Sequence, residues 1–393
     1  MSKLPGSRVA PVPSDRRNLA LSENGFVLTE GGIVRRRDLL RSAAPAGLQE
    51  ENAAFPAAPP RPDRRLFLRR SAAALVYLSA VPLWDRLARG VLAQQSPWTA
   101  PGMPPEVTPV GSFYNISKNL WDPVVDVRRW SLSIEGLVHH PFVLDYRQLT
   151  TGGPTVQEYV TLTCISNEVG GPLTGNALWR GVRLRDLLQS AGVKEGAVDL
   201  VMEGHDDYTD SIPIEKAMHP DTLLVWEMNG EPLTPAHGFP ARLIVPGIYG
   251  MKNVKWIRRL EVVDYDYKGY WAQRGWSDVA HVKTWSRIDA PRSAQVRRGE
   301  EVVVGGLAYA GDRGVERVEV SFDGGVTWNR AELKEPLGPY AWRLWAHRWT
   351  PPGPGRHVIL VRATDGTGVT QSEVRVGTLP DGAEGYHTRV LRA

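Results

Sequence analysis

Two neighbouring stretches of the chain decide its fold, Tyr159-Val-Thr-Leu-Thr-Cys-Ile-Ser-Asn-Glu168 and Gly175-Asn-Ala-Leu-Trp-Arg-Gly-Val182. The first begins with β-branched residues typical of a buried strand and then carries the only cysteine of the chain, Cys164. A single cysteine forms no disulfide within its chain and cannot complete a zinc site built from several thiolates. Cys164 is therefore a small buried hydrophobe, a nucleophile, or one thiolate ligand of a metal that another group mainly holds.

A second segment, from Asn229 to Ile257, is dense in residue types that bind anions and cofactors. Its glycine-rich backbone can approach a phosphate or a pterin closely, and a guanidinium gives bidentate hydrogen bonds to a phosphate. Taken singly, each polar residue is also compatible with a structural role; their occurrence in one chain with Cys164 favours a cofactor site. The candidates are His237, Arg242, Asn253, Val254 and Lys255.

The region from residue 111 to 280 alternates short strands with short helices. Apolar and β-branched runs predict strands, and an Asn229-Gly230 turn follows one of them. Helical spacing predicts a helix over 182–191 that stops at Gly192, and a short helix or turn over 143–149. This mixture predicts an α+β domain. The expected strands are 130–134, 159–164, 198–203, 223–228, 241–245 and 254–263.

The region from residue 281 to 393 has a different pattern. Its apolar residues alternate with period two in several short runs, and Asp323-Gly-Gly and Asp365-Gly supply turns between them. Short strands at this spacing predict a β-sandwich of immunoglobulin-like type. The boundary between the two domains is expected between Tyr270 and Pro291.

The N-terminal part of the chain predicts export. Residues 1–63 are rich in Pro, Ala, Arg and Ser and are expected to be disordered. Residues 64–93 combine Arg64-Arg65, a short apolar run and the small residues before Gln94, which is typical of a twin-arginine signal and of delivery to the periplasm. A basic amphipathic helix on a membrane surface and an uncleaved anchor are the alternatives, and a start codon nearer Arg64 is compatible with the pattern. Residues 94–110 are expected to be a linker.

Composition excludes some classes of function. The chain has 393 residues, which fits two domains at roughly 150 residues each. The net charge is only +4 and the arginines are scattered, which argues against nucleic acid as a ligand. The sequence contains no Gly-x-Ser-x-Gly elbow, His-Glu-x-x-His pair or Walker loop, so a hydrolase is disfavoured.

Together these residues resemble the sulfite oxidase family of molybdopterin-dependent oxidoreductases, over about residues 111–390. The resemblance implies that Cys164 ligates molybdenum, for which a soft thiolate is suited, and that Mo-molybdopterin is the cofactor. It places Trp179 and Tyr267 beside the substrate pocket, where the Tyr267 hydroxyl can donate to an oxyanion or oxo group. It also implies a homodimer formed through the C-terminal domain. The implied molybdopterin contacts are Tyr114, Asn115, Ser117, Cys164, Asp206, His237, Arg242, Asn253, Val254 and Lys255.

The chain departs from this family where the family places arginines that bind a small dianion. Asn115 stands at the first of these positions, Glu168-Val169 at the second, and the arm 378–386 contains no arginine. We therefore expect oxygen-atom transfer to or from a small substrate that need not be charged, with sulfite oxidation proper and an inactive exported binding module as alternatives. No heme-binding domain precedes the molybdopterin region, so no heme is expected, and electrons are expected to pass to a separate cytochrome or a quinone-linked membrane subunit.

Overall fold

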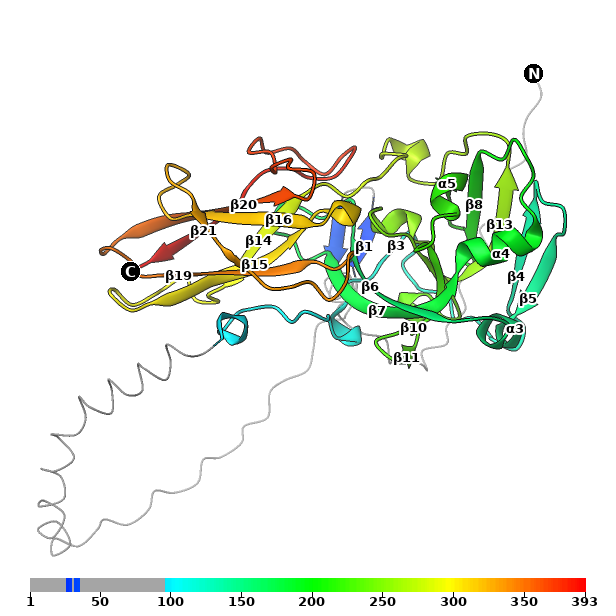
Figure 1. Cartoon of the computed structure of the whole chain (residues 1–393), viewed down its shortest axis with the longest axis horizontal. Coiled ribbons are helices and arrows are strands. Elements are labelled where there is room, and N and C mark those ends of the chain that lie inside the picture. The colour runs from blue at the N-terminus through cyan, green and yellow to red at the C-terminus, as the bar shows by residue number, and fades with distance from the viewer. Residues whose placement is uncertain (1–25, 30–31, 36–95) are drawn as a thin grey trace, which may run out of the picture.

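The structure, a computed structural model, describes residues 26–29, 32–35 and 96–393 (Figure 1). The expected signal segment 64–93 lies outside the described residues. Two short strands, β1 (Phe26–Thr29) and β2 (Gly32–Arg35), occur within the extension predicted to be disordered and join the edge of β3 (Ile116–Ser117). Each of the two strands is a short run that contains apolar and β-branched residues, and β3 offers a partner edge. No described helix is long and apolar enough to cross a membrane.

The first domain contains two five-stranded sheets, one of which carries the cysteine. Its strand order is β11-β10-β7-β6, with β12 also paired to β10, and β6 (Val156–Thr163) ends immediately before Cys164. The other sheet has the order β5-β4-β13-β8-β9. The remaining strands are β4 (Ser131–Gly136), β5 (Phe142–Asp145), β7 (Thr174–Arg183), β8 (Asp199–Gly204), β9 (Thr209–Pro213), β10 (Leu223–Met228), β11 (Glu231–Pro232), β12 (Arg242–Ile244) and β13 (Ile257–Val263).

Helices in this domain are few and short, and local capping sets their ends. The helix or turn expected over 143–149 is instead strand β5 followed by α3 (Tyr146–Thr151), because Asp145 and Gln148 form a capping box that starts the helix at Tyr146. Helix α4 (Leu184–Ala191) ends at Gly192, whose φ of 67° suits glycine. The others in this domain are α5 (Ile214–Ala217) and the 3-10 turns η2 (Val110–Ser112), η3 (Pro235–His237), η4 (Gly250–Lys252) and η5 (Ala272–Arg274). The 3-10 turn η1 (Pro97–Thr99) precedes the domain, and η6 (Gly311–Arg313) belongs to the second domain.

The second domain is a β-sandwich of two four-stranded sheets, β14-β15-β19-β18 and β17-β16-β20-β21. Its strands alternate inward apolar and outward polar residues, and the inward set forms a separate buried core that includes Val318, Trp345 and Ile359. The predicted fold class, an α+β domain followed by a β-sandwich, is confirmed, although strands dominate both. The strands are β14 (Trp285–Ala290), β15 (Val302–Tyr309), β16 (Val315–Ser321), β17 (Asn329–Arg330), β18 (Glu332–Leu333), β19 (Arg343–Trp349), β20 (Arg356–Asp365) and β21 (His387–Arg392).

The second domain supports the strand and loop that carry Cys164. The Tyr309 hydroxyl donates to the Thr161 carbonyl at 3.1 Å, and the Trp342 amide donates to the Thr161 hydroxyl at 2.9 Å. Beyond the cysteine, Arg287 Nη1 donates to the carbonyl of Gly171 at 2.8 Å. The position of the thiol is therefore fixed from both domains.

Candidate active site

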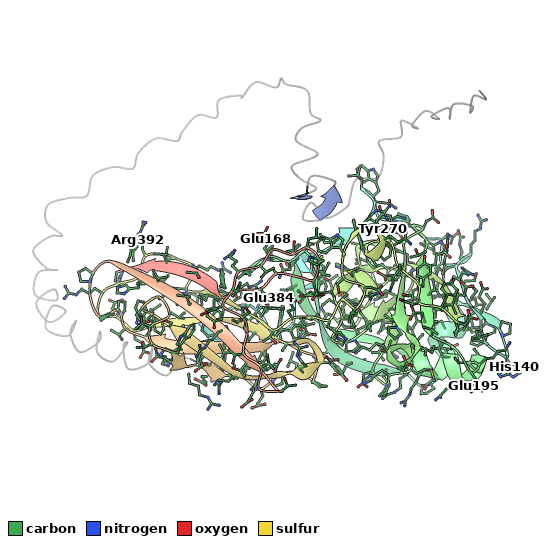
Figure 2. The ribbon with its side chains drawn as sticks, turned by 90° about the horizontal axis from the view of Figure 1, so that it is seen from above. His140, Glu168, Glu195, Tyr270, Glu384 and Arg392 are labelled. Carbon is green, nitrogen blue, oxygen red and sulfur yellow. The ribbon has the colours of Figure 1, made fainter. Side chains whose placement is uncertain are left out.

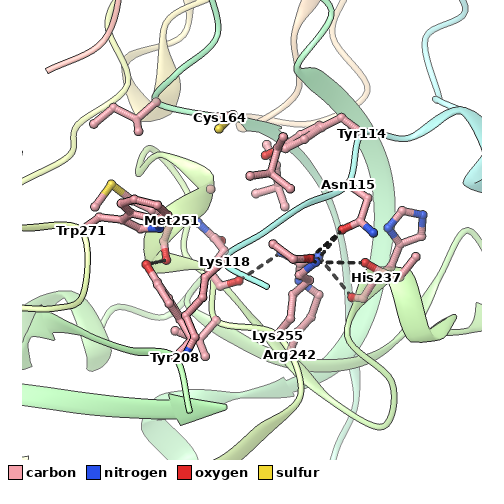
Figure 3. A pocket seen from close by; sticks show the side chains of 18 of the residues that line it. Tyr114, Asn115, Lys118, Cys164, Tyr208, His237, Arg242, Met251, Lys255 and Trp271 are labelled. Carbon is pink, nitrogen blue, oxygen red and sulfur yellow. Dashed lines mark hydrogen bonds between the residues drawn. The ribbon is translucent and has the colours of Figure 1, made fainter. Parts of the chain in front are cut away.

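A cleft that is partly open to solvent lies beside Cys164 (Figure 3); the space between its walls, with the open mouth counted, is about 810 Å³. Several regions converge on it, among them the segment around β3, the end of β6, the η3 turn, and the η4 turn with the residues that follow it. The sequence-predicted residues that line it are Tyr114, Asn115, Ser117, Cys164, Asp206, His237, Arg242, Asn253, Val254 and Lys255.

Cys164 is held rigidly at the end of β6. Its amide donates to the Leu173 carbonyl at 2.9 Å, and its Sγ lies 3.0 Å from Ser166 Oγ. Burial raises the pKa of the thiol, while the hydrogen bond from Ser166 opposes that shift. The thiol is therefore protonated in the free protein, and a soft metal ion would have to displace the proton on binding.

Arg242 is a buried cation without a matching anion. Its Nη1 donates to the His237 carbonyl at 3.2 Å and its Nη2 to the Asn253 carbonyl at 3.1 Å, while its Nε has no hydrogen-bond partner. Burial lowers the pKa of the guanidinium to about 10. Within the described part of the chain no carboxylate pairs with it, and burying an unpaired charge is costly. An anionic ligand in the cleft would therefore compensate the buried charge of Arg242.

Lys255 supplies a second cation and ties β3 to the cleft. Its Nζ donates to Asn115 Oδ1 at 2.6 Å, to Ser117 Oγ at 3.0 Å and to the Ala236 carbonyl at 3.2 Å. Asp122 receives hydrogen bonds from Asn115 at 2.7 Å and from Ser117 at 2.6 Å. The β3 segment is thereby locked against the residues that follow η4.

His237, Asn253 and Asp206 shape the polar wall. His237 Nε2 lies 3.0 Å from the Val110 carbonyl, and burial lowers its pKa to about 4, so the imidazole is neutral at pH 7. Asn253 Oδ1 accepts from the Val245 amide at 2.7 Å, which holds the turn that presents Arg242. Burial raises the pKa of Asp206, whose side chain accepts from the Tyr208 amide.

The structure does not bring Trp179 or Tyr267 to the cleft. Trp179 is fully buried, and its Nε1 donates to the Val160 carbonyl at 3.0 Å, because it belongs to the core of the sheet that carries Cys164. The Tyr267 hydroxyl donates to Thr209 Oγ1 at 2.8 Å, which turns it toward β9. Their assignment to the substrate pocket is not supported by this geometry.

Glu168 also lies away from this cleft. It is exposed and borders a separate, smaller cavity with Tyr249, Trp285 and Arg287. Figure 2 shows Glu168 and Glu384 near the middle of the molecule, where the two domains meet. Its negative charge therefore does not face the space beside the thiol. The sequence analysis placed it there because it stands a few residues after Cys164, where the family has an arginine, but Ser166 is the last residue of this loop that lines the cleft.

Sequence reasoning missed the outer wall of the cleft. Tyr208 was missed because it follows a turn at Asp207, whose φ is 59°, and neither helical nor strand periodicity applies there. Trp271 and Trp276 come from a segment that forms no strand and no long helix, so hydrophobic periodicity gives no signal there. The missed lining residues include Lys118, Tyr208, Met251, Trp271 and Trp276.

The residues present fit molybdopterin. Among residues 96–393 no group of three or more His, Cys, Asp and Glu side chains could hold a metal, so a metal at Cys164 must arrive with other ligands attached. Arg242 and Lys255, which both line the cleft, would bind the anionic end of such a carrier. A cysteine sulfur and a guanidinium without a carboxylate partner face the same space, which suits a soft metal that an anionic cofactor carries.

Comparisons with known proteins agree with this interpretation. Residues 119–271 match the oxidoreductase molybdopterin binding domain, and residues 279–380 match the Mo-co oxidoreductase dimerisation domain. Sulfite oxidase of Arabidopsis thaliana is 31% identical over 285 residues, covering 59% of this chain and 71% of that protein. Mitochondrial sulfite oxidase of Rattus norvegicus is 34% identical over 222 residues, covering 48% and 41%.

Two further relatives differ in activity. Nitrate reductase [NAD(P)H] of Hordeum vulgare is 31% identical over 301 residues, which cover 61% of this chain and 34% of that protein. The crystal structure of the sulfane dehydrogenase SoxCD from Paracoccus pantotrophus superposes with a TM-score of 0.64 at 27% identity, covering 73% of this chain and 81% of that chain.

The fold and the cleft therefore define a molybdopterin-dependent oxidoreductase. The chain belongs to the sulfite oxidase family, as its resemblance predicted. It spans about a third to a half of the length of several curated relatives, including the rat and barley enzymes. The dimerisation domain suggests a homodimer.

Proposed function

We propose that this protein is a periplasmic molybdenum enzyme that transfers an oxygen atom to or from a small uncharged substrate, such as a sulfoxide and its thioether. The observation that carries the proposal is the shared cleft. In it the Cys164 thiol and the Arg242 guanidinium, with which no described carboxylate pairs, face the same space. Bound molybdopterin would supply the two-electron redox chemistry and the site of oxygen transfer. The protein would hold, orient and shield it.

Each side chain has a distinct task in this proposal. Cys164 holds the metal, while Arg242 and Lys255 bind the anionic end of the cofactor. Neutral His237 fixes η2 through the Val110 carbonyl without adding charge. Trp271 and Trp276 form an apolar outer wall that limits the entry of water.

The missing arginine at the family's first anion-binding position favours an uncharged substrate over sulfite. Asn115, at the position where the family places an arginine, is neutral and already engaged by Asp122 and Lys255. Arg313, another candidate to replace a missing cation, is paired with Asp365 at 2.8 Å. Oxide reduction consumes two electrons and two protons and releases water, so a separate electron-transfer protein is required, either a cytochrome or a quinone-linked subunit.

Metal and pterin analysis of the purified protein, combined with steady-state assays, tests this function. Reduction of dimethyl sulfoxide by a reduced viologen dye is compared with oxidation of sulfite by an artificial acceptor. We expect stoichiometric molybdenum and faster turnover of the sulfoxide. Protein without molybdenum or pterin when expressed in a cofactor-producing host would support the inactive-module alternative, and micromolar sulfite turnover would support sulfite oxidation.

Periplasmic delivery is a separate proposal that rests on the sequence of residues 64–93. A twin-arginine motif is recognised as an address, so conserving its charge does not preserve it. Arg64→Lys combined with Arg65→Lys is expected to leave the full-length precursor in the cytoplasm. Normal periplasmic recovery of the double variant would rule out this route.

A further inference from the structure

Tyr114 carries a hydroxyl in the cleft to which the proposed function assigns no task. Its side chain lines the cleft and extends toward Cys164 (Figure 3). Its hydroxyl has no hydrogen-bond partner among the residues that the structure describes, whereas the neighbouring Tyr208 hydroxyl is engaged by Asp210 at 2.9 Å and by the Met251 carbonyl at 3.0 Å. Tyr114 is thus the tyrosine of this cleft whose donor is available to a ligand.

Packing fixes where this hydroxyl lies. The Tyr114 ring stacks on Phe113 with 5.4 Å between centroids and 17° between planes. On its other side the hydroxyl lies over the bare backbone of Gly250, because a Cβ atom there would come within 2.5 Å of it. Asn115, the next residue, is anchored by Lys255 and Asp122. The position of the Tyr114 hydroxyl is therefore fixed by the stacking of its ring, by the Gly250 backbone beside it and by the anchored neighbour Asn115.

The hydroxyl is a donor throughout the working pH range. Burial raises the pKa of Tyr114 far above its ordinary value; the nearby Cys164 adds to the shift and Arg242 opposes it. A phenol that stays protonated and lacks a partner donates to any oxygen that enters its reach. Preorganised donors of this kind stabilise oxygen atoms that gain negative charge during a reaction.

We propose that Tyr114 is a catalytic residue whose hydroxyl donates a hydrogen bond to the oxygen atom that is transferred beside Cys164. The role expected from the sequence for Tyr267 belongs to Tyr114, because Tyr267 is turned away and bonded to Thr209. No proton leaves the phenol in this step; the hydrogen bond only strengthens as charge collects on the oxygen. This inference rests on the proposed oxygen-transfer function.

Tyr114→Phe in the holoenzyme is the first test. It removes the hydroxyl and keeps the ring that stacks on Phe113, so molybdenum and pterin content should equal those of the wild type. We expect kcat for dimethyl sulfoxide to fall about tenfold to a hundredfold, with a smaller change in KM. Tyr265→Phe, which alters an exposed tyrosine, serves as the control. If the wild type turns over only sulfite, the same comparison is made with sulfite, so failure of the proposed substrate does not decide the role of Tyr114.

A double-mutant cycle with Gly250→Ala tests the geometry without any activity measurement. The new methyl should displace the Tyr114 hydroxyl and lower the melting temperature in the wild-type background, but should be tolerated in Tyr114→Phe, where the atom it meets is gone. Non-additive melting temperatures together with the loss of kcat support the proposal. Additive effects, or a Tyr114→Phe enzyme with full kcat while Tyr267→Phe loses it, would overturn it.

Discussion

The guanidinium carbon of Arg242 lies 5.3 Å from the centre of the Trp179 ring. Trp179 is fully buried and pinned to the Val160 carbonyl, so its ring is a fixed platform for the guanidinium. The attraction between a cation and an aromatic face contributes on the order of 0.5–2 kcal/mol, and the contribution is largest when both groups are shielded from water. Trp179 therefore acts on the anion site through Arg242 and has no contact with the substrate space.

Trp179→Phe should weaken cofactor binding more than it alters substrate selectivity. The smaller ring loses the Val160 hydrogen bond and the best face for the cation, so we expect about tenfold weaker retention of molybdopterin. Pterin content after dialysis measures this directly. Trp345→Phe is the matched control, because Trp345 is also fully buried but lies in the core of the second domain. A changed ratio of sulfoxide to sulfite activity at full cofactor content would contradict this role for Trp179.

Arg242→Ala should lower cofactor content more than it lowers stability. In the free protein the guanidinium has only two carbonyl partners and an unsatisfied Nε, so its removal there relieves a buried charge. In the loaded protein the cofactor anion loses its partner, which costs on the order of 2–5 kcal/mol. Molybdenum occupancy and the melting temperature of the apoprotein separate the two effects. Unchanged occupancy with a lower melting temperature would show that Arg242 is only structural.

The sequence predicted the architecture because periodicity and turn chemistry report on short-range structure. Strand β10 and the Asn229-Gly230 turn appeared where an apolar run and residues that tolerate a positive φ placed them. The β5–α3 boundary was missed because it depends on one capping box between Asp145 and Gln148. Capping and hydrophobic periodicity compete over so few residues that pattern alone could not choose.

The candidate site was predictable where one short segment carries several ligating residue types. Arg242 and Lys255 fall within one such stretch, and both line the cleft. The direction of Trp179 and Tyr267 was not predictable, because it depends on which face of β7 is buried and on a partner, Thr209, that is distant in sequence. Side-chain direction in a buried sheet is a tertiary property.

Cys164→Ser should abolish turnover while leaving the fold and much of the pterin in place. An alkoxide is a harder and poorer ligand for a soft metal site, whereas Arg242 and Lys255 still bind the anionic end of the cofactor. Ser166→Ala is the matched control, because it removes only the neighbour that lies 3.0 Å from the thiol. Activity, molybdenum and pterin are measured on the same preparation. Full turnover by Cys164→Ser would disprove the ligand assignment.

His237 should make the apoprotein less stable in acid. Burial lowers its pKa to about 4, and the cations Arg242 and Lys255 add to the shift against the opposing Val110 carbonyl. The unfolded chain has an ordinary value near ~6.5, so between these values the unfolded state binds more protons and stability falls as pH falls. The loss should be on the order of 2–3 kcal/mol.

Denaturant unfolding of the apoprotein at pH 7 and near pH 4.5 measures this loss. His237→Gln keeps a donor for the Val110 carbonyl but does not titrate, so it should lose less stability than the wild type over the same interval. Taking the difference between the two proteins removes the contribution of the carboxylates that titrate in both. Equal losses in both proteins would mean that His237 does not titrate between these pH values.

Sulfite should be a poor substrate for the loaded enzyme. The family arginine is replaced by Asn115, which is held by Asp122 and Lys255, and the arm 378–386 supplies no guanidinium. Because Glu168 lies outside the cleft, the weakness comes from missing cations and not from repulsion by that carboxylate. Each absent charge-assisted hydrogen bond removes roughly 1.5–3 kcal/mol, so two losses predict an affinity lower by about a hundredfold or more.

This origin of the weak binding has its own test. If repulsion by Glu168 were responsible, Glu168→Gln would lower KM for sulfite; if missing cations are responsible, the substitution would leave KM unchanged. Lys118, which lines the outer part of the cleft, is the cation best placed to compensate, so Lys118→Ala should weaken whatever sulfite binding exists. Both variants are compared at two ionic strengths. Lys118 is partly exposed to solvent, so salt should screen its attraction for sulfite. A fall in KM for sulfite in Glu168→Gln would show that the Glu168 carboxylate repels the substrate. It would contradict the conclusion that missing cations cause the weak binding.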